Sequence, residues 1–210
     1  MAIQAAEAVK WTPNAVYLKR NTNVLALNNN TVPMTSGAKK PSDSQASCQV
    51  CKGDCGDYSN VKKGYPRYNV AAKECLVAVP KELKGYKTKD IDVFLKPEVL
   101  QKFQEMSAAY KKTHKNQELL LNAGFRDKKG QEAMVRMYPS LAAPVGYTEH
   151  HTGCAVDIKD AAEGSERYNW LMKHGKEYGF ELSYPQNNSQ GVTPESWHWR
   201  YNANLKNKMI

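Results

Sequence analysis

Two short motifs near the C-terminal end limit what this chain can fold into more than any other feature. The segment TEHHTGCAVD places His150 and Asp157 seven positions apart, and PESWHWRY places Glu195 and His198 three apart. Imidazole and carboxylate groups are zinc ligands, and donor atoms that share one zinc lie within about 3.5 Å of each other. Seven residues span roughly 23 Å as a strand and about 10 Å as a helix. The backbone must therefore double back between His150 and Asp157, most easily at Thr152 and Gly153.

A zinc site that hydrolyses an amide needs three protein ligands, an open position for water and a carboxylate close to that water. We expect Glu195 to be this carboxylate and to accept a proton from a zinc-activated water. A fixed guanidinium would stabilise the negative charge that develops on the carbonyl oxygen, and Arg126, at the end of a predicted strand, is the candidate.

The two motifs resemble SxHxxGxAxD and ExxH of the VanY-type zinc D-alanyl-D-alanine carboxypeptidases, which group with D,D-dipeptidases, L,D-carboxypeptidases and some phage endolysins. The segment AGFRDKKGQ is similar to the SGYRSxxxQ stretch of that family, and the resemblance covers roughly residues 76 to 202. It implies zinc as the cofactor and the following roles: zinc ligands His150, Asp157 and His198, general base Glu195, substrate-side arginine Arg126, and substrate contacts at Thr148 and Gln131.

The chain departs from the family pattern at a few positions. Thr148 replaces the usual serine but keeps a hydroxyl, and Asn122 and Asp127 differ within the arginine segment. Ser183 lies in FELSYP, where carboxypeptidase members often carry arginine in a similar FxLRYP stretch. These departures bear on substrate preference more than on catalysis.

The predicted elements favour an α+β fold with a small, mainly antiparallel sheet and packed helices. Helices are expected over 97–115, 131–138 and 166–178, and strands over 76–80, 118–125, 180–184 and 196–201. The resemblance implies the fold shared by D,D-peptidases and the hedgehog signalling domain. We assign residues 70–210 to a zinc peptidase domain and residues 1–69 to an N-terminal arm or linker with a cysteine cluster.

The five cysteines leave at least one thiol unpaired in a monomer. Cys48, Cys51, Cys55 and Cys75 could form disulfides, remain free or hold a metal, whereas Cys154 is expected to be a small buried hydrophobe.

Side chains beside the motifs have simpler interpretations. His151 is expected to face solvent, His114 and His174 to lie on helix surfaces, and Trp197 and Trp199 to pack in the core.

A formal charge of +9 favours a polyanionic neighbour, and the scattered basic residues match no nucleic-acid-binding module. We expect no nucleic acid partner, no integral membrane segment and a monomer. The first residues do not resemble a secretory leader. A cell-wall substrate implies an extracytoplasmic location, in the wall or periplasm. We therefore expect either a leader absent from this chain or another export route.

We therefore expect a zinc carboxypeptidase that removes the terminal D-alanine from peptidoglycan stem peptides. An endopeptidase or endolysin with the same metal site, and a non-catalytic zinc-stabilised binding module, remain alternatives. The presence of Glu195 argues against the module, because a purely structural zinc needs no base. D,D and L,D specificity depend on pocket walls that the sequence does not specify.

Overall fold

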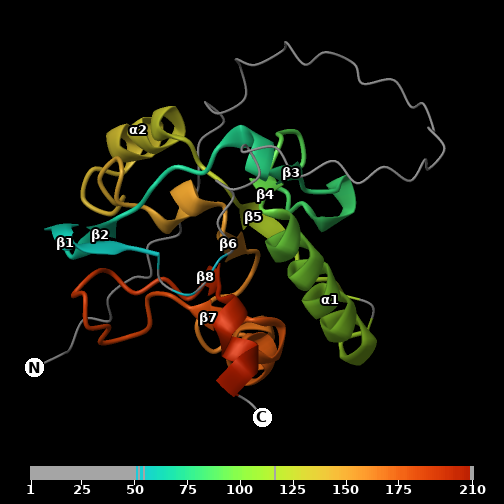
Figure 1. The fold of residues 1–210 in the computed structure, drawn as a ribbon. Coiled ribbons are helices and arrows are strands. Elements are labelled where there is room, and N and C mark those ends of the chain that lie inside the picture. The colour runs from blue at the N-terminus through green and yellow to red at the C-terminus, as the bar shows by residue number, and fades with distance from the viewer. Residues whose placement is uncertain (1–50, 52, 54, 116, 209–210) are drawn as a thin grey trace, which may run out of the picture. The chain divides into compact units, whose positions relative to one another are not determined.

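The computed structural model describes residues 51–208 except 52, 54 and 116, and these belong to one compact unit, residues 40–210. Helices and a small antiparallel sheet make up this unit (Figure 1), so the predicted α+β class is confirmed. In chain order its main elements are β1 (Asp57–Lys62), β2 (Tyr65–Arg67), β3 (Val77–Ala78), β4 (Phe94–Leu95), α1 (Pro97–Thr113), β5 (Leu121–Ala123), α2 (Lys128–Met137), β6 (Ala155–Ile158), α3 (Glu166–His174), β7 (Phe180–Leu182) and β8 (His198–Tyr201).

The central sheet has four strands in the order β5-β6-β8-β7, and every neighbouring pair is antiparallel (Figure 1). Its register places Asp157 opposite His198 and Val156 opposite Trp199. Successive side chains of a strand point to opposite faces. One face of the β6–β8 pair is therefore polar, whereas Val156 and Trp199 belong to the hydrophobic core.

Helix α1 covers the apolar side of this sheet. The predicted helix over 97–115 is observed as Pro97–Thr113, with proline in the first turn, where its missing N–H costs no helical hydrogen bond. Phe103 of α1 packs edge-on against Phe180 of β7, with ring centroids 6.2 Å apart. Tyr110 makes a similar contact with Trp170 of α3 at 5.3 Å. These aromatic contacts connect α1 to both the sheet and α3.

The bend inferred between His150 and Asp157 is present. A 3-10 helix, Glu149–Thr152, ends at Gly153, whose φ of 70° lies in the left-handed region that favours glycine. A Cβ at this position would lie 2.7 Å from Cδ2 of Leu76, so a larger residue would also collide with its surroundings. Strand β6 starts two residues later and returns the chain toward His150.

Part of the expected N-terminal arm is folded. Strands β1 and β2 form an antiparallel hairpin, and Tyr65 of β2 packs edge-on against Tyr184 with ring centroids 5.8 Å apart. The Tyr147 hydroxyl donates a hydrogen bond of 2.8 Å to Oδ1 of Asn60 in β1. Residues 1–50 lie outside the described residues, and the division between residues 69 and 70 stays a prediction.

A disulfide joins Cys51 to Cys154, with Cα atoms 6.0 Å apart. The expectation that Cys154 is merely a small buried hydrophobe is wrong: it is buried, but its sulfur is bonded to a cysteine 103 positions away, which only the folded chain brings near. Cys75 is also disulfide-bonded, and Cys55 is an exposed free thiol. Cys48 lies outside the described residues.

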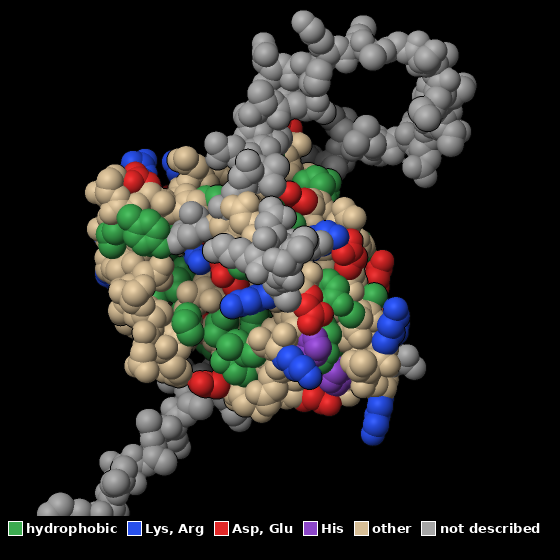
Figure 2. Space-filling model, turned by 60° about the horizontal axis from the view of Figure 1, so that its bottom comes forward, with side chains coloured by type: hydrophobic (Ala, Val, Ile, Leu, Met, Phe, Trp, Pro, Cys, Tyr) green, Lys and Arg blue, Asp and Glu red, His purple; other side chains and the backbone are tan. Residues whose placement is uncertain are grey.

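The surface of the described unit carries charges of both signs. On the face in Figure 2, Lys and Arg side chains are interspersed with Asp and Glu side chains. None of the helices within the described part of the chain is long and apolar enough to cross a membrane.

Candidate metal centre

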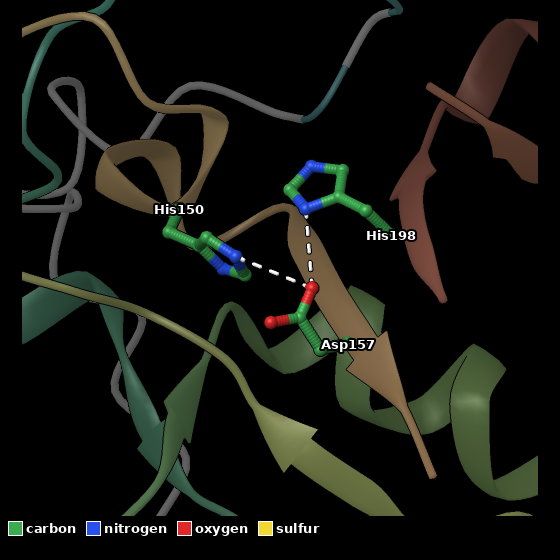
Figure 3. A group of neighbouring side chains, drawn as sticks. All are labelled: His150, Asp157 and His198. Atoms are coloured by element: carbon green, nitrogen blue, oxygen red, sulfur yellow. Dashed lines mark hydrogen bonds and ion pairs between the residues drawn. The ribbon is translucent and has the colours of Figure 1, made fainter. Parts of the chain in front are cut away.

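Three buried side chains from three elements converge on one point (Figure 3). His150 comes from the 3-10 helix, Asp157 from β6 and His198 from β8. Oδ1 of Asp157 lies 3.1 Å from Nδ1 of His198 and 3.4 Å from Nε2 of His150. The three residues are only 3–5% exposed. The sequence-predicted ligands are thus brought together by the bend before β6 and the β6–β8 register.

The donor set fits a metal ion. One ligand atom from each residue lies within 4.8 Å of the others, and within residues 51–208, where described, no other group of His, Cys, Asp or Glu is arranged in this way. Among the described residues, the buried Nδ1 of His150 has no hydrogen-bond partner, whereas Nε2 of the same ring lies 3.4 Å from Oδ1 of Asp157. Two imidazoles and one carboxylate form a common ligand set for a metal ion.

Electrostatics within the group favour an ionised carboxylate. Burial alone would raise the pKa of Asp157, but the neighbouring imidazoles of His150 and His198 outweigh it and hold this pKa well below its usual range. Burial lowers the pKa of His150 to about 4, and the charge of Arg126 acts in the same direction. Asp157 is therefore an anion and His150 a neutral imidazole, as metal binding requires. Burial acts to lower the pKa of His198, but the hydrogen bonds to Asp157 and Glu149 outweigh it and raise this pKa to about 10, so the ring must release a proton when a metal binds.

Glu195 lies beside this group without joining it. Its Oε2 atom is 3.7 Å from Nδ1 of His198, and 26% of its side chain is exposed. Its backbone N–H donates to the carbonyl of Tyr184, and its own carbonyl accepts from the N–H of His198, which holds the turn before β8. Desolvation raises the pKa of Glu195 to about 7. A carboxylate with such a pKa can both accept and return a proton near neutral pH.

Main-chain and side-chain hydrogen bonds hold Arg126 next to the group of His150, Asp157 and His198. Its N–H donates to the carbonyl of His150 over 3.1 Å. Its Nη1 donates to Oε1 of Gln131 over 2.9 Å, and Nε2 of Gln131 donates to the carbonyl of Ala143. Gln131 is 1% exposed, and the guanidinium of Arg126 is the donor that its side-chain oxygen accepts from. The predicted contact of Gln131 with substrate stays a prediction.

Thr148 and His151 organise the backbone around His150. The Thr148 hydroxyl accepts the N–H of His150 over 3.3 Å and caps the 3-10 helix. The expectation that His151 faces solvent is wrong, because His151 is fully buried. Its Nδ1 lies 2.6 Å from the carbonyl of Arg126, and its Nε2 accepts the N–H of Gly146. The ring thereby bridges the Arg126 and Gly146 loops.

The two flanking tryptophans have different environments. Trp199 is 2% exposed within the core, as predicted, whereas Trp197 lies half-buried in the turn before β8. The alternation argument holds for Trp199 because β8 starts at His198 and does not include Trp197. His114 and His174 are partly exposed at helix ends, in agreement with their predicted positions.

Sequence reasoning missed Glu149, a carboxylate 3% exposed and adjacent to His150. Its Oε2 lies 2.9 Å from Nε2 of His198 and accepts the hydroxyl of Ser183 over 2.5 Å. Ser183, noted as a departure from the family pattern, is therefore engaged by Glu149. Only the position of Glu149 beside His150 hinted at a role, because neither the motif spacing nor the predicted strands place it near His198.

The fold is that of the D,D-peptidase-like α+β proteins. The structure of VanYB in complex with D-alanine-D-alanine superposes with a TM-score of 0.50 at 19% identity, covering 79% of this chain and 94% of that one. The D,D-dipeptidase VanXYg, solved with a D-Ala-D-Ala phosphinate analogue, gives a TM-score of 0.53 at 20% identity, covering 71% of this chain and 64% of that one. At these identities the likeness shows a common fold.

The family assignment comes from the sequence comparison. The family model described as VanY, D-alanyl-D-alanine carboxypeptidase, matches residues 92–204, more than half of the chain, and the chain belongs to this family. A D-alanyl-D-alanine carboxypeptidase of Enterococcus faecium is 29% identical over 155 residues, which cover 70% of this chain and 51% of that protein. The chain thus spans about half the length of this curated relative.

Proposed function

We propose that the chain is a zinc-dependent carboxypeptidase that removes the terminal D-alanine from peptidoglycan stem peptides. The observation that carries this proposal is the convergence of His150, Asp157 and His198, with the separate carboxylate of Glu195 3.7 Å from His198. Three protein ligands leave one position of a tetrahedral zinc for water, which is the arrangement of catalytic rather than structural sites. Zinc bound there would lower the pKa of a coordinated water to about 7.

The protein side chains would then divide the remaining work. Glu195 accepts a proton from the attacking water and passes it to the leaving amine, since a pKa of about 7 suits both steps. Arg126, held by Gln131 and by the backbone of His150, supports the negative charge that develops on the substrate carbonyl oxygen. Thr148 and Gln131 remain proposed substrate contacts.

Two observations support action outside the cytoplasm, in the wall or periplasm. Disulfides persist mainly in oxidising compartments, and this chain has the Cys51–Cys154 bond and a disulfide at Cys75. The net charge of +9 suits an anionic cell-wall polymer.

Fold neighbours described as bound to D-Ala-D-Ala or its phosphinate analogue support a D-alanine-containing substrate.

The test is release of free alanine from synthetic tetrapeptide and pentapeptide stems, using protein as purified, after chelation and after zinc is restored. We expect release that chelation abolishes and zinc restores, and the preferred stem distinguishes L,D from D,D specificity. Larger fragments without free alanine would indicate an endopeptidase instead. Zinc-loaded protein that cleaves neither stem would favour a binding module.

Two substitutions separate metal binding from catalysis. Glu195→Ala should retain zinc while kcat falls by about 10²–10⁴-fold, because only the proton acceptor is removed. Asp157→Ala should lose both zinc and turnover, because it removes a buried ligand. Zinc content by metal analysis and kcat from alanine release measure the two effects. Full activity in Glu195→Ala would contradict the assigned mechanism.

A further inference from the structure

Glu149 lies on the side of His198 that faces away from the ligand group. The two nitrogens of the His198 ring have different carboxylate neighbours: Nδ1 is 3.1 Å from Oδ1 of Asp157, and Nε2 is 2.9 Å from Oε2 of Glu149. Both carboxylates are buried, and Glu149 is 3% exposed. A neutral imidazole carries one N–H. With Asp157 engaged as a ligand of the proposed metal, Glu149 is the carboxylate left to accept that N–H, on Nε2.

We propose that Glu149 is a positioning residue that keeps the proton of His198 on Nε2 and so leaves the lone pair of Nδ1 directed at the metal. This inference rests on the proposed zinc site. Carboxylates that accept the second N–H of a ligand histidine fix its tautomer and ring orientation, and their loss typically costs 10–100-fold in metal affinity.

Glu149 itself is fully engaged as a hydrogen-bond acceptor. Its Oε2 accepts from Ser183 and contacts His198, while its Oε1 accepts the Tyr68 hydroxyl over 3.2 Å and Nη1 of Arg200 over 3.1 Å. These four partners fix the position and the rotation of the carboxylate. Glu149 is absent from the group of converging ligand atoms, so it supports a ligand without being one.

From these contacts we expect that an uncharged amide does not replace this carboxylate. His198 Nε2–H and Arg200 Nη1 both donate from fixed directions, whereas the hydroxyls of Ser183 and Tyr68 can rotate. In Glu149→Gln one end of the side chain becomes an NH₂ donor, which must face either Arg200 or His198. Facing Arg200, it creates a donor–donor conflict, and facing His198, it favours the proton on Nδ1, which then cannot bind metal.

The experiment compares zinc dissociation constants, measured by competition with a chromophoric chelator, in the full chain and two variants. We expect Glu149→Gln to bind zinc about 10–100-fold more weakly than the wild type. Glu181→Gln is the matched control, because Glu181 also accepts a hydrogen bond from Arg200, at 2.9 Å, but is not among the hydrogen-bond or ion-pair partners of His198. It should bind zinc within about twofold of wild type. Circular dichroism melting checks that each variant is folded.

A second measurement needs no variant. In ¹⁵N-labelled zinc-loaded wild type, the His198 ring should show a protonated Nε2 and an unprotonated Nδ1 with a metal-bound chemical shift. A proton on Nδ1, or zinc on Nε2, would overturn the proposal even if Glu149→Gln failed to fold.

The remaining outcomes separate this inference from the proposed function. A folded Glu149→Gln variant with unchanged zinc affinity, or an equal loss in Glu181→Gln, overturns the role of Glu149 and leaves the carboxypeptidase proposal standing. Wild-type protein that binds no zinc overturns both.

Discussion

The Cys51–Cys154 disulfide should make a large contribution to stability, and replacing both cysteines with alanine tests this. The bond joins the start of the described unit to the residue after Gly153, at a sequence separation of 103. Cys51 is also held by other contacts: its N–H donates to Glu98, and its carbonyl accepts the N–H of Ala203. The native position of Cys51 should therefore survive the substitution, and the main change should be in the unfolded chain.

The expected magnitude follows from the length of the closed loop. In the chain-entropy model a loop of about 100 residues stabilises a protein by about 4.7 kcal/mol at 25 °C. The disulfide at Cys75 already restricts the unfolded chain, so we expect Cys51→Ala/Cys154→Ala to lower the free energy of unfolding by about 4 kcal/mol. For a chain of this size the midpoint of thermal unfolding should fall by roughly 8–16 °C.

Urea unfolding followed by circular dichroism measures the effect, in a Cys55→Ser background so that the free thiol cannot exchange with a disulfide. The background variant with its disulfides intact is the control. A loss below about 1 kcal/mol, with native-like spectra in the double variant, would refute the argument that this bond acts through the unfolded chain.

Two further substitutions test the site and the core separately. Gln131→Ala removes the side-chain hydrogen-bond partner of Arg126. We expect kcat/KM for the preferred stem peptide to fall about tenfold, which corresponds to about 1.4 kcal/mol, with zinc content unchanged. Unchanged kinetics would show that the guanidinium needs no such support. Trp199→Ala empties a core position that is 2% exposed, and urea unfolding should show a loss of about 3–5 kcal/mol. A loss below about 1 kcal/mol would mean that the core collapses around the gap.

Much of the candidate metal site could be predicted from sequence because the information is local. His150 and Asp157 lie in one short motif with a glycine between them, and His198 follows Glu195 by three positions. The helix over 97–113 was predicted to within two residues, since its apolar spacing and Pro97 mark it clearly. Helix α2 starts at Lys128, three residues before the predicted start, because Asp127 caps it by accepting the N–H of Gly130.

The missed features all depend on partners distant in sequence. His151 appears polar and exposed in the chain but is buried between the Arg126 and Gly146 loops. Cys154 meets Cys51 only after the chain has folded. The hairpin of β1 and β2 lies in a stretch rich in Asn, Ser, Lys and Gly, where no apolar periodicity predicts strands. It packs through Tyr65 against Tyr184.

The sequence by itself determined the residue types of the candidate ligands, the bend between His150 and Asp157, and the family to which the chain belongs. Each of these depends on residue identity and short spacing, which survive without knowledge of the fold. Only the tertiary structure decided which nitrogen of His198 faces Asp157, and that Glu149 lies behind it. The orientation of the His198 ring follows from the β6–β8 register and from the contact between Glu149 of the 3-10 helix and His198 of β8. Residues 49 positions apart that form a hydrogen bond produce no periodic pattern in the sequence, so this contact could not be predicted from it.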